Sequence, residues 1–207
     1  MSERKNLTKS KRQNKSIPKP PKRRPNIELR SREYLTPNEV STLIQAAGSS
    51  GRYGHRNMTM LLVCYRHALR VSELITLRWE QLDFSNKVIH INRIKHGVPS
   101  LHPLQHDVID ALKPLLQHEH TNPYVFTTRQ NPHISAATVR NIVAHAGMKA
   151  GFPFSIHPHM LRHACGFYLA NQGFDTRAIQ YYMGHKNIQH TVRYTELTPE
   201  RFKEFWT

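Results

Sequence analysis

The sequence predicts a mainly α-helical domain with one small antiparallel β-sheet, preceded by a basic arm. Apolar residues recur at helical spacing through most of the chain after residue 30, and period-two alternation is confined to residues 87–104. Prolines and basic residues crowd the first 30 positions instead. A length of 207 residues suits one domain with a tail and is enough to bury a core.

The first helix is expected to begin after Thr36. Thr36 is a good N-cap, Pro37 suits the first helical position, and Glu39 completes a capping box. The apolar stripe that follows ends where Gly48, Gly51 and Gly54 interrupt it. A second helix is then expected over residues 57–67, and a short one, capped by Ser72, runs to residue 77.

The alternating segments 87–93 and 98–104 predict a β-hairpin, because His96-Gly97 supplies a turn between them. The remaining expected elements are helices over 109–116, 135–150 (capped by Ser135), 159–172 and 176–183 (capped by Thr176), a short strand or extended piece at 124–127, and a short terminal helix over 197–206.

The net charge of +16 and pI of about 10.2 indicate a polyanionic partner, either nucleic acid or an anionic membrane surface. No apolar run approaches the roughly 18 residues of a membrane span, and the charged N-terminus is unlike a secretory signal. Cys64 and Cys165 lie far apart, which argues against a disulfide framework or a zinc ribbon. We therefore expect a soluble protein of the reducing cytoplasm.

Residues 1–30 carry 11 basic and two acidic side chains, together with four prolines and few large apolar residues. Such a segment cannot offset its ordering entropy by burial, so we predict a flexible basic arm in front of a folded domain over 31–207. The arm is either a solvated tail or a device that neutralises phosphates. In the second case Lys22, Arg23 and Arg24 are candidate DNA contacts.

Three local strings carry the chemistry. They are Ala68-Leu69-Arg70-Val71-Ser72-Glu73-Leu74, His159-Met160-Leu161-Arg162-His163, and Met183-Gly184-His185 followed by Tyr194 nine residues later. In this order, with a hairpin lysine between the first two, they resemble the catalytic core of the tyrosine recombinase (phage integrase) family. The resemblance covers roughly residue 34 to the C-terminus, and it implies that family's catalytic-core fold.

The resemblance implies that DNA is cut and rejoined through a 3′-phosphotyrosyl intermediate. Such a transesterification needs a nucleophile, stabilisation of the non-bridging oxygens and a proton for the leaving 5′-oxygen. Tyr194 is the expected nucleophile. Arg70 and Arg162 are expected to clamp the scissile phosphate, since guanidinium donors fit phosphate oxygens in bidentate fashion.

The remaining catalytic candidates are His159, His185 and Lys95. The resemblance implies that His159 helps to take the tyrosine proton, that His185 hydrogen-bonds the phosphate, and that Lys95 protonates the leaving 5′-oxygen. Glu73 is a candidate for orienting Arg70. No metal and no other cofactor is expected: His159 and His163 have a zinc-ligand spacing, but Met160 stands where the H-E-x-x-H glutamate belongs.

The strings around residues 156–166 and 181–190 look like the short fimbrial phase-variation invertases. That implies inversion of a promoter segment between inverted repeats in duplex DNA, by a homotetramer in the bacterial nucleoid, with accessory DNA-bending proteins as possible partners. No separate N-terminal DNA-binding domain is expected before residue 31. The apolar C-terminal residues are expected to dock on a neighbouring protomer or to fold back in cis. The alternatives are a prophage or transposon integrase of the same family and a non-catalytic basic DNA-binding protein.

Deleting residues 1–30 is expected to weaken DNA binding and to flatten its salt dependence, because fewer phosphate contacts release fewer counterions. Titration of a labelled duplex at several salt concentrations measures both effects. Equal slopes for the full and truncated chains would show that the arm is only a solvated tail.

Overall fold

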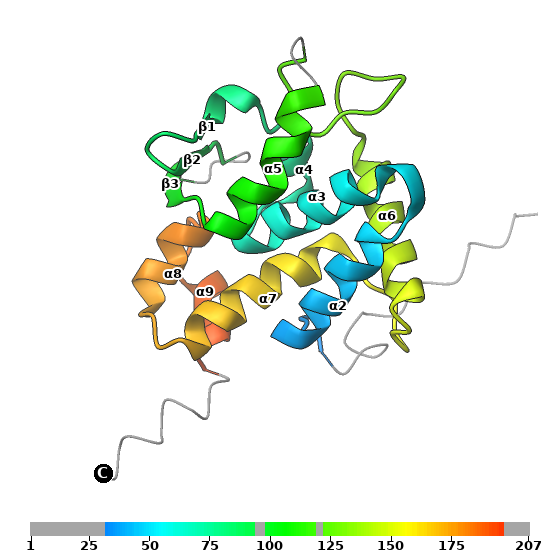
Figure 1. Cartoon of the computed structure of the whole chain (residues 1–207). Coiled ribbons are helices and arrows are strands. Elements are labelled where there is room, and N and C mark those ends of the chain that lie inside the picture. The colour runs from blue at the N-terminus through cyan, green and yellow to red at the C-terminus, as the bar shows by residue number, and fades with distance from the viewer. Residues whose placement is uncertain (1–31, 94–97, 119–121, 197–207) are drawn as a thin grey trace, which may run out of the picture. The chain divides into compact units, whose positions relative to one another are not determined.

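The computed structural model describes residues 32–93, 98–118 and 122–196, without the side chains of 117 and 118. These residues belong to one compact unit. Helices surround a central helix, and one three-stranded antiparallel sheet lies at the side (Figure 1). The predicted fold class is therefore confirmed. No helix in the described ranges is long and apolar enough to span a membrane.

The elements keep the expected order along the chain. They are α2 (Pro37–Gly48), a 3-10 turn (Gly51–Tyr53), α3 (Gly54–Arg66), α4 (Val71–Ile75), a 3-10 turn (Trp79–Gln81), β1 (Leu82–Asp83), β2 (Val88–Ile91), β3 (Ser100–Pro103), α5 (His106–His118), α6 (Ala136–Lys149), α7 (Pro158–Asn171), α8 (Thr176–Met183) and α9 (Gln189–Thr195).

Helix starts follow the caps that the sequence offers, with two corrections. Thr36 and Glu39 form the predicted capping box of α2, and Ser135 caps α6. Helix α4, however, begins after Arg70 rather than at Ser72, because the Glu73 carboxylate accepts the Arg70 backbone N–H at 2.9 Å. Asp175 caps α8 in place of Thr176, since its carboxylate accepts two backbone N–H groups of the first turn.

Helix α3 forms the centre of the core and packs against α2, α5 and α7. It begins at Gly54, three residues earlier than expected, because the chain turns back closely on the end of α2. A Cβ atom on Gly54 would lie 1.9 Å from the carbonyl oxygen of Gly48, so only glycine permits this approach. The central residues of α3 are fully buried, and they include Met60, Leu61, Val63 and Cys64.

The predicted hairpin is present as β2 and β3, which pair in antiparallel register with Ile89 opposite His102. Its tip, residues 94–97, lies outside the described residues. Strand β1 was not predicted, because two residues are too short for a period-two pattern; it pairs with β2. Tyr124 makes a single bridge with Arg78, so the segment 124–127 is extended rather than a strand.

Helix α7 links the two sides of the molecule. It packs against α2, α3 and α6 and also against α8 and α9, which lie together at the lower left of Figure 1. Helix α9 was not predicted as a helix. The expected arm (1–30) and terminal helix (197–206) fall outside the described residues and stay predictions.

Two histidines are buried beside this core. His67 is 0% exposed and neither ring nitrogen has a hydrogen-bond partner among the described residues. His102, on β3, stacks on Tyr182 with ring centroids 3.7 Å apart. Burial lowers the pKa of each to about 3, and the nearby Arg93 charge acts in the same direction.

Acid is therefore expected to destabilise the fold. In the unfolded chain these histidines titrate near their ordinary pKa of about 6.5. Between about pH 6.5 and 3 the unfolded state binds more protons, so stability falls as pH falls, by up to about 1.4 kcal/mol per pH unit for each histidine. His67→Leu should reduce the dependence of the unfolding free energy on pH by up to about 1.4 kcal/mol per pH unit, which corresponds to one proton. Urea unfolding at pH 7, 6 and 5 measures this dependence. If the variant kept the wild-type dependence of stability on pH, the low pKa of His67 in the folded state would be contradicted.

Candidate active site

A cavity of about 370 Å³ brings the three sequence strings together. It lies between the start of α4, the first turns of α7, the α8–α9 turn and α9. Five of the six predicted catalytic residues line it, and Lys95 lies outside the described residues. The lining consists of Arg70, His159, Arg162, His163, Gly184, His185, Lys186, His190, Arg193 and Tyr194.

The guanidinium of Arg162 is fixed by backbone carbonyls. It is 3% exposed and donates to the carbonyl oxygen of Ala68 and, at 2.7 Å, to that of Met183. Two of its five N–H donors serve this anchoring, which leaves others for an anion in the cavity. Burial lowers the pKa of Arg162 to about 10, and the charges of Arg70 and Arg93 add to the effect. The side chain still carries its charge at neutral pH.

A buried carboxylate, Glu73, holds two guanidinium groups. Its Oε1 accepts from Arg70 at 2.7 Å and its Oε2 accepts from Arg93 at 2.9 Å. Its side chain is only 2% exposed. Burial opposes ionisation, but the Arg70 backbone N–H and the Arg93 charge outweigh burial and lower the pKa of Glu73. Glu73 is therefore ionised and orients Arg70 as the sequence predicted.

Arg93 is a residue of this site that the sequence prediction missed. Its side chain is 0% exposed and reaches Glu73, the Ala68 carbonyl and the Tyr182 carbonyl. Ile89, Ile91 and Arg93 share the inward face of the hairpin strand. An arginine in an inward register was the available signal, because buried arginines in proteins are almost always paired.

The Tyr194 hydroxyl forms a hydrogen bond with a histidine of α7. The distance from its oxygen to His163 Nδ1 is 2.8 Å. The tyrosine is 1% exposed, and its ring lies so close to Gly166 that a Cβ there would be 2.9 Å from ring carbons. Burial raises the pKa of Tyr194 to about 12, against the opposing charge of Arg162. The nucleophile candidate is thus held protonated in this structure.

The sequence assigned the tyrosine proton to His159, whereas the residue at the phenol is His163. His159 lies one turn earlier on α7 at the exposed mouth of the cavity, with its ring centroid 6.3 Å from that of His163. Burial lowers the pKa of His163 to about 3, and the nearby Arg193 charge adds to this. The neutral imidazole is available to accept a proton.

His185 faces the same tyrosine from the α8–α9 turn. Its Nδ1 pairs with Thr191 Oγ1 at 2.9 Å, and its ring lies parallel to that of Tyr194 with centroids 6.3 Å apart. Burial lowers the pKa of His185 to about 3, followed by the charges of Arg162 and Arg70. Gly184 permits this turn: its φ is +64°, and a Cβ there would meet Arg93 at 2.6 Å.

Metal ligation finds no support in the described ranges. No group of three or more His, Cys, Asp or Glu side chains there is arranged to hold an ion. The cavity brings together a protonated phenol, four imidazoles and three guanidinium groups, among them the Tyr194 hydroxyl, His163, His185, Arg70 and Arg162. Those groups suit nucleophilic attack on a phosphate, with the guanidinium groups binding its oxygens.

The sequence is similar to those of known proteins. The model of the phage integrase family matches residues 33–201. The chain is 40% identical over 185 residues to the type 1 fimbriae regulatory protein FimE of Escherichia coli (strain K12), an alignment that covers 86% of this chain and 92% of that protein. It is 41% identical over 182 residues to FimB of the same strain, covering 86% and 90%. The tyrosine recombinase XerC of Pelotomaculum thermopropionicum is 30% identical over 193 residues, covering 88% and 63%.

Solved structures of recombinases have a similar fold. The crystal structure of XerA recombinase matches with a TM-score of 0.72 at 26% identity, covering 84% of this chain and 63% of that one. XerH recombinase bound to its difH substrate matches with a TM-score of 0.70 at 20% identity, covering 85% and 53%, which supports the fold alone. The resemblance noted in the sequence is thus confirmed: the chain belongs to the phage integrase family and is a tyrosine recombinase.

Proposed function

We propose that this chain is a site-specific DNA recombinase that inverts a promoter segment and so controls fimbrial phase variation. One observation carries the chemistry: the Tyr194 hydroxyl and two guanidinium groups meet in one cavity. The biological role rests on the 40% identity to FimE and 41% identity to FimB. The identity of 40% to FimE against 30% to XerC favours the fimbrial type over an integrase of another kind.

The proposed reaction begins with a scissile phosphate in the cavity. Arg162 and Arg70 bind its non-bridging oxygens, and His185 donates a hydrogen bond to it. The Tyr194 oxygen attacks phosphorus while its proton passes to His163, which lies 2.8 Å away. The bond from phosphorus to the 5′-oxygen breaks, and the leaving oxygen takes a proton, for which Lys95 is the candidate donor. Attack by a 5′-hydroxyl reverses these steps and rejoins the DNA.

Burial of Tyr194 and His163 controls when the proton of the tyrosine is transferred. With the pKa of Tyr194 at about 12 and that of His163 at about 3, proton transfer in the empty cavity is strongly unfavourable. A bound phosphate favours the His163 imidazolium but disfavours a free Tyr194 phenolate, so the proton moves while the phenol oxygen bonds to phosphorus. The nucleophile is therefore protected until DNA binds.

We further propose that the substrate DNA carries inverted-repeat sites and that a homotetramer binds the paired sites. Accessory DNA-bending proteins are the other proposed partners. The cytoplasm, at the bacterial nucleoid, is the compartment where this substrate lies. These points rest on the similarity to FimE and FimB and on the basic arm.

Tyr194→Phe is expected to abolish covalent attachment to DNA, since the attacking oxygen is removed. The assay uses a nicked suicide duplex that carries the inverted repeat next to the coding region, and the adduct is separated on a denaturing gel. Tyr181→Phe is the matched control, because Tyr181 is 64% exposed on α8. If the Tyr194→Phe variant still formed an adduct, Tyr194 would not be the nucleophile. No adduct from the wild type would support the non-catalytic alternative.

His163→Ala is expected to slow adduct formation by roughly 10²- to 10⁴-fold at saturating DNA, as for loss of a general base. His159→Ala should have a smaller effect, because His159 lies farther out along α7. Single-turnover rates of the two variants decide between the two histidines. The opposite order would return the proton-transfer role to His159.

A further inference from the structure

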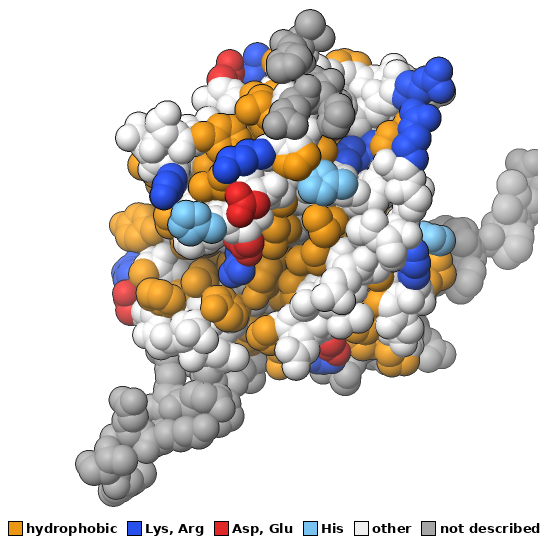
Figure 2. All heavy atoms as spheres, viewed as in Figure 1, with side chains coloured by type: hydrophobic (Ala, Val, Ile, Leu, Met, Phe, Trp, Pro, Cys, Tyr) orange, Lys and Arg blue, Asp and Glu red, His pale blue; other side chains and the backbone are white. Residues whose placement is uncertain are grey.

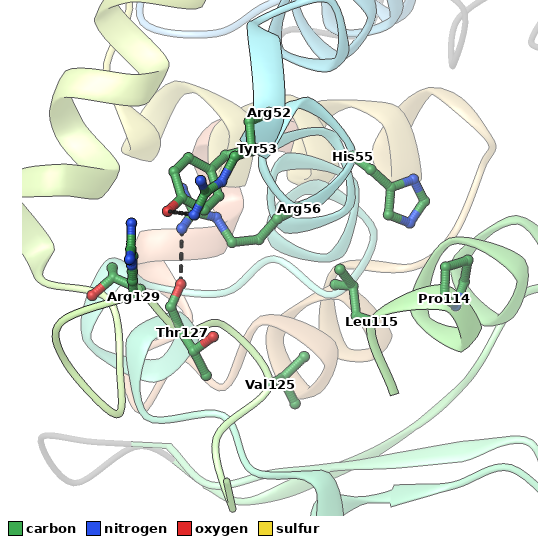
Figure 3. Close-up of a pocket in the computed structure, with 10 residues that line it drawn as sticks. Arg52, Tyr53, His55, Arg56, Pro114, Leu115, Val125, Thr127 and Arg129 are labelled. Carbon is green, nitrogen blue, oxygen red and sulfur yellow. Dashed lines mark hydrogen bonds between the residues drawn. The ribbon is translucent and has the colours of Figure 1, made fainter. Parts of the chain in front are cut away.

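A second cavity, of about 700 Å³, lies at the start of α3 and shares no lining residue with the catalytic cavity. It is bounded by the α2–α3 turn, the end of α5 and the segment that leads from α5 to α6 (Figure 3). Figure 2 shows Lys and Arg side chains gathered at the upper right of the viewed face, near these segments. The catalytic mechanism uses none of this surface.

The charge of this cavity is one-sided. Arg52, Arg56 and Arg129 line it, and none of its lining residues is acidic. Arg52 and Arg129 take part in no ion pair among the described residues. Guanidinium groups left without carboxylates around a cavity of this size are suited to an anionic ligand.

An aromatic ring positions two of these arginines. The guanidinium carbons of Arg52 and Arg56 lie 5.1 Å and 4.4 Å from the centroid of the Tyr53 ring. Arg52 also donates to the Tyr53 hydroxyl at 3.2 Å, and Arg56 donates to the Thr127 carbonyl at 2.8 Å, the bond drawn in Figure 3. Arg129, from the segment between α5 and α6, lines the same cavity and is labelled in Figure 3. Arg52 and Arg56 are therefore held in place before any ligand arrives.

We propose that this cavity is a second phosphate-binding site, which takes a backbone phosphate of the bound duplex away from the cleavage point. The proposal rests on the function proposed above. Helix α3 starts at this cavity, and Arg70 follows its end by four residues. Its 13 residues span about 20 Å at 1.5 Å per residue, roughly six base pairs of DNA at 3.4 Å each. A short stretch of duplex is therefore long enough to reach from one cavity to the other.

The contact is sequence-independent, because guanidinium groups on a phosphate read no base edge. Its role is to add affinity for the duplex at a point away from the cleaved bond. It adds to the affinity that the basic arm is predicted to supply, from a part of the chain with a defined structure.

The test is the double variant Arg52→Ala/Arg129→Ala, whose residues are exposed and lie outside the catalytic cavity. Its log Kd for a duplex is measured against log salt concentration. Loss of one or two phosphate contacts should reduce the slope by roughly 1 to 2 and weaken binding to all sequences alike. The rate of adduct formation at saturating DNA should stay at the wild-type value.

Arg177→Ala/Lys87→Ala is the matched control, since it removes two exposed cationic groups elsewhere, on α8 and in the β1–β2 turn. It should keep the wild-type slope. The proposal is overturned if the Arg52/Arg129 variant has the same slope as wild type or as this control.

A free phosphate or mononucleotide is the other source of the same chemistry. Titration of inorganic phosphate and of AMP, followed by tyrosine fluorescence, tests it. If the double variant lost AMP binding but bound DNA with the affinity of the wild type, the duplex would not be the ligand of this cavity. Failure of wild-type protein to form any adduct would instead remove the recombinase function and leave the salt slopes interpretable.

Discussion

The buried carboxylate of Glu73 is the constraint on which the active site depends. Arg70 and Arg162 line the cavity and Arg93 is buried near them, so the charges of Arg70 and Arg93 lower the pKa of Arg162 beyond the effect of burial. Glu73 binds two of these groups at 2.7 and 2.9 Å and so offsets the repulsion before DNA is present. It also accepts the backbone N–H of Arg70, which starts α4 and fixes where Arg70 leaves the backbone. One side chain thus sets a helix start, a charge balance and the position of the Arg70 guanidinium.

A few close contacts connect Glu73 to Tyr194. Arg93 bonds Glu73 with one nitrogen and the Tyr182 carbonyl with another, and it lies directly against Gly184. Gly184 begins the turn that carries His185, and α9 after it carries Tyr194. Gly166 on α7 then leaves room for the Tyr194 ring. Tyr194, His163 and the guanidinium groups of the cavity are therefore linked through a few contacts in which a larger side chain would not fit.

Sequence reasoning succeeded where the information is local, as in the Thr36 capping box and the β2–β3 hairpin. It assigned the caps of two helices to the wrong residues, because Glu73 and Asp175 supply side-chain acceptors that compete with nearby hydroxyls. It could not tell which histidine of α7 lies at the phenol, since only the tertiary position of Tyr194 separates His159 from His163. Arg93 could have been found from its inward register on the strand. The Arg52–Arg129 cavity could not, because its arginines come from segments more than 70 residues apart.

The most direct test of this account is the single-turnover rate of adduct formation by Glu73→Gln, measured with its thermal stability. A neutral amide keeps the shape of the side chain but removes the charge that holds Arg70 and Arg93. The account predicts a folded protein whose rate falls by roughly 10²- to 10³-fold, the usual cost of a lost preorganised donor. A folded variant that forms the adduct at the wild-type rate would contradict it.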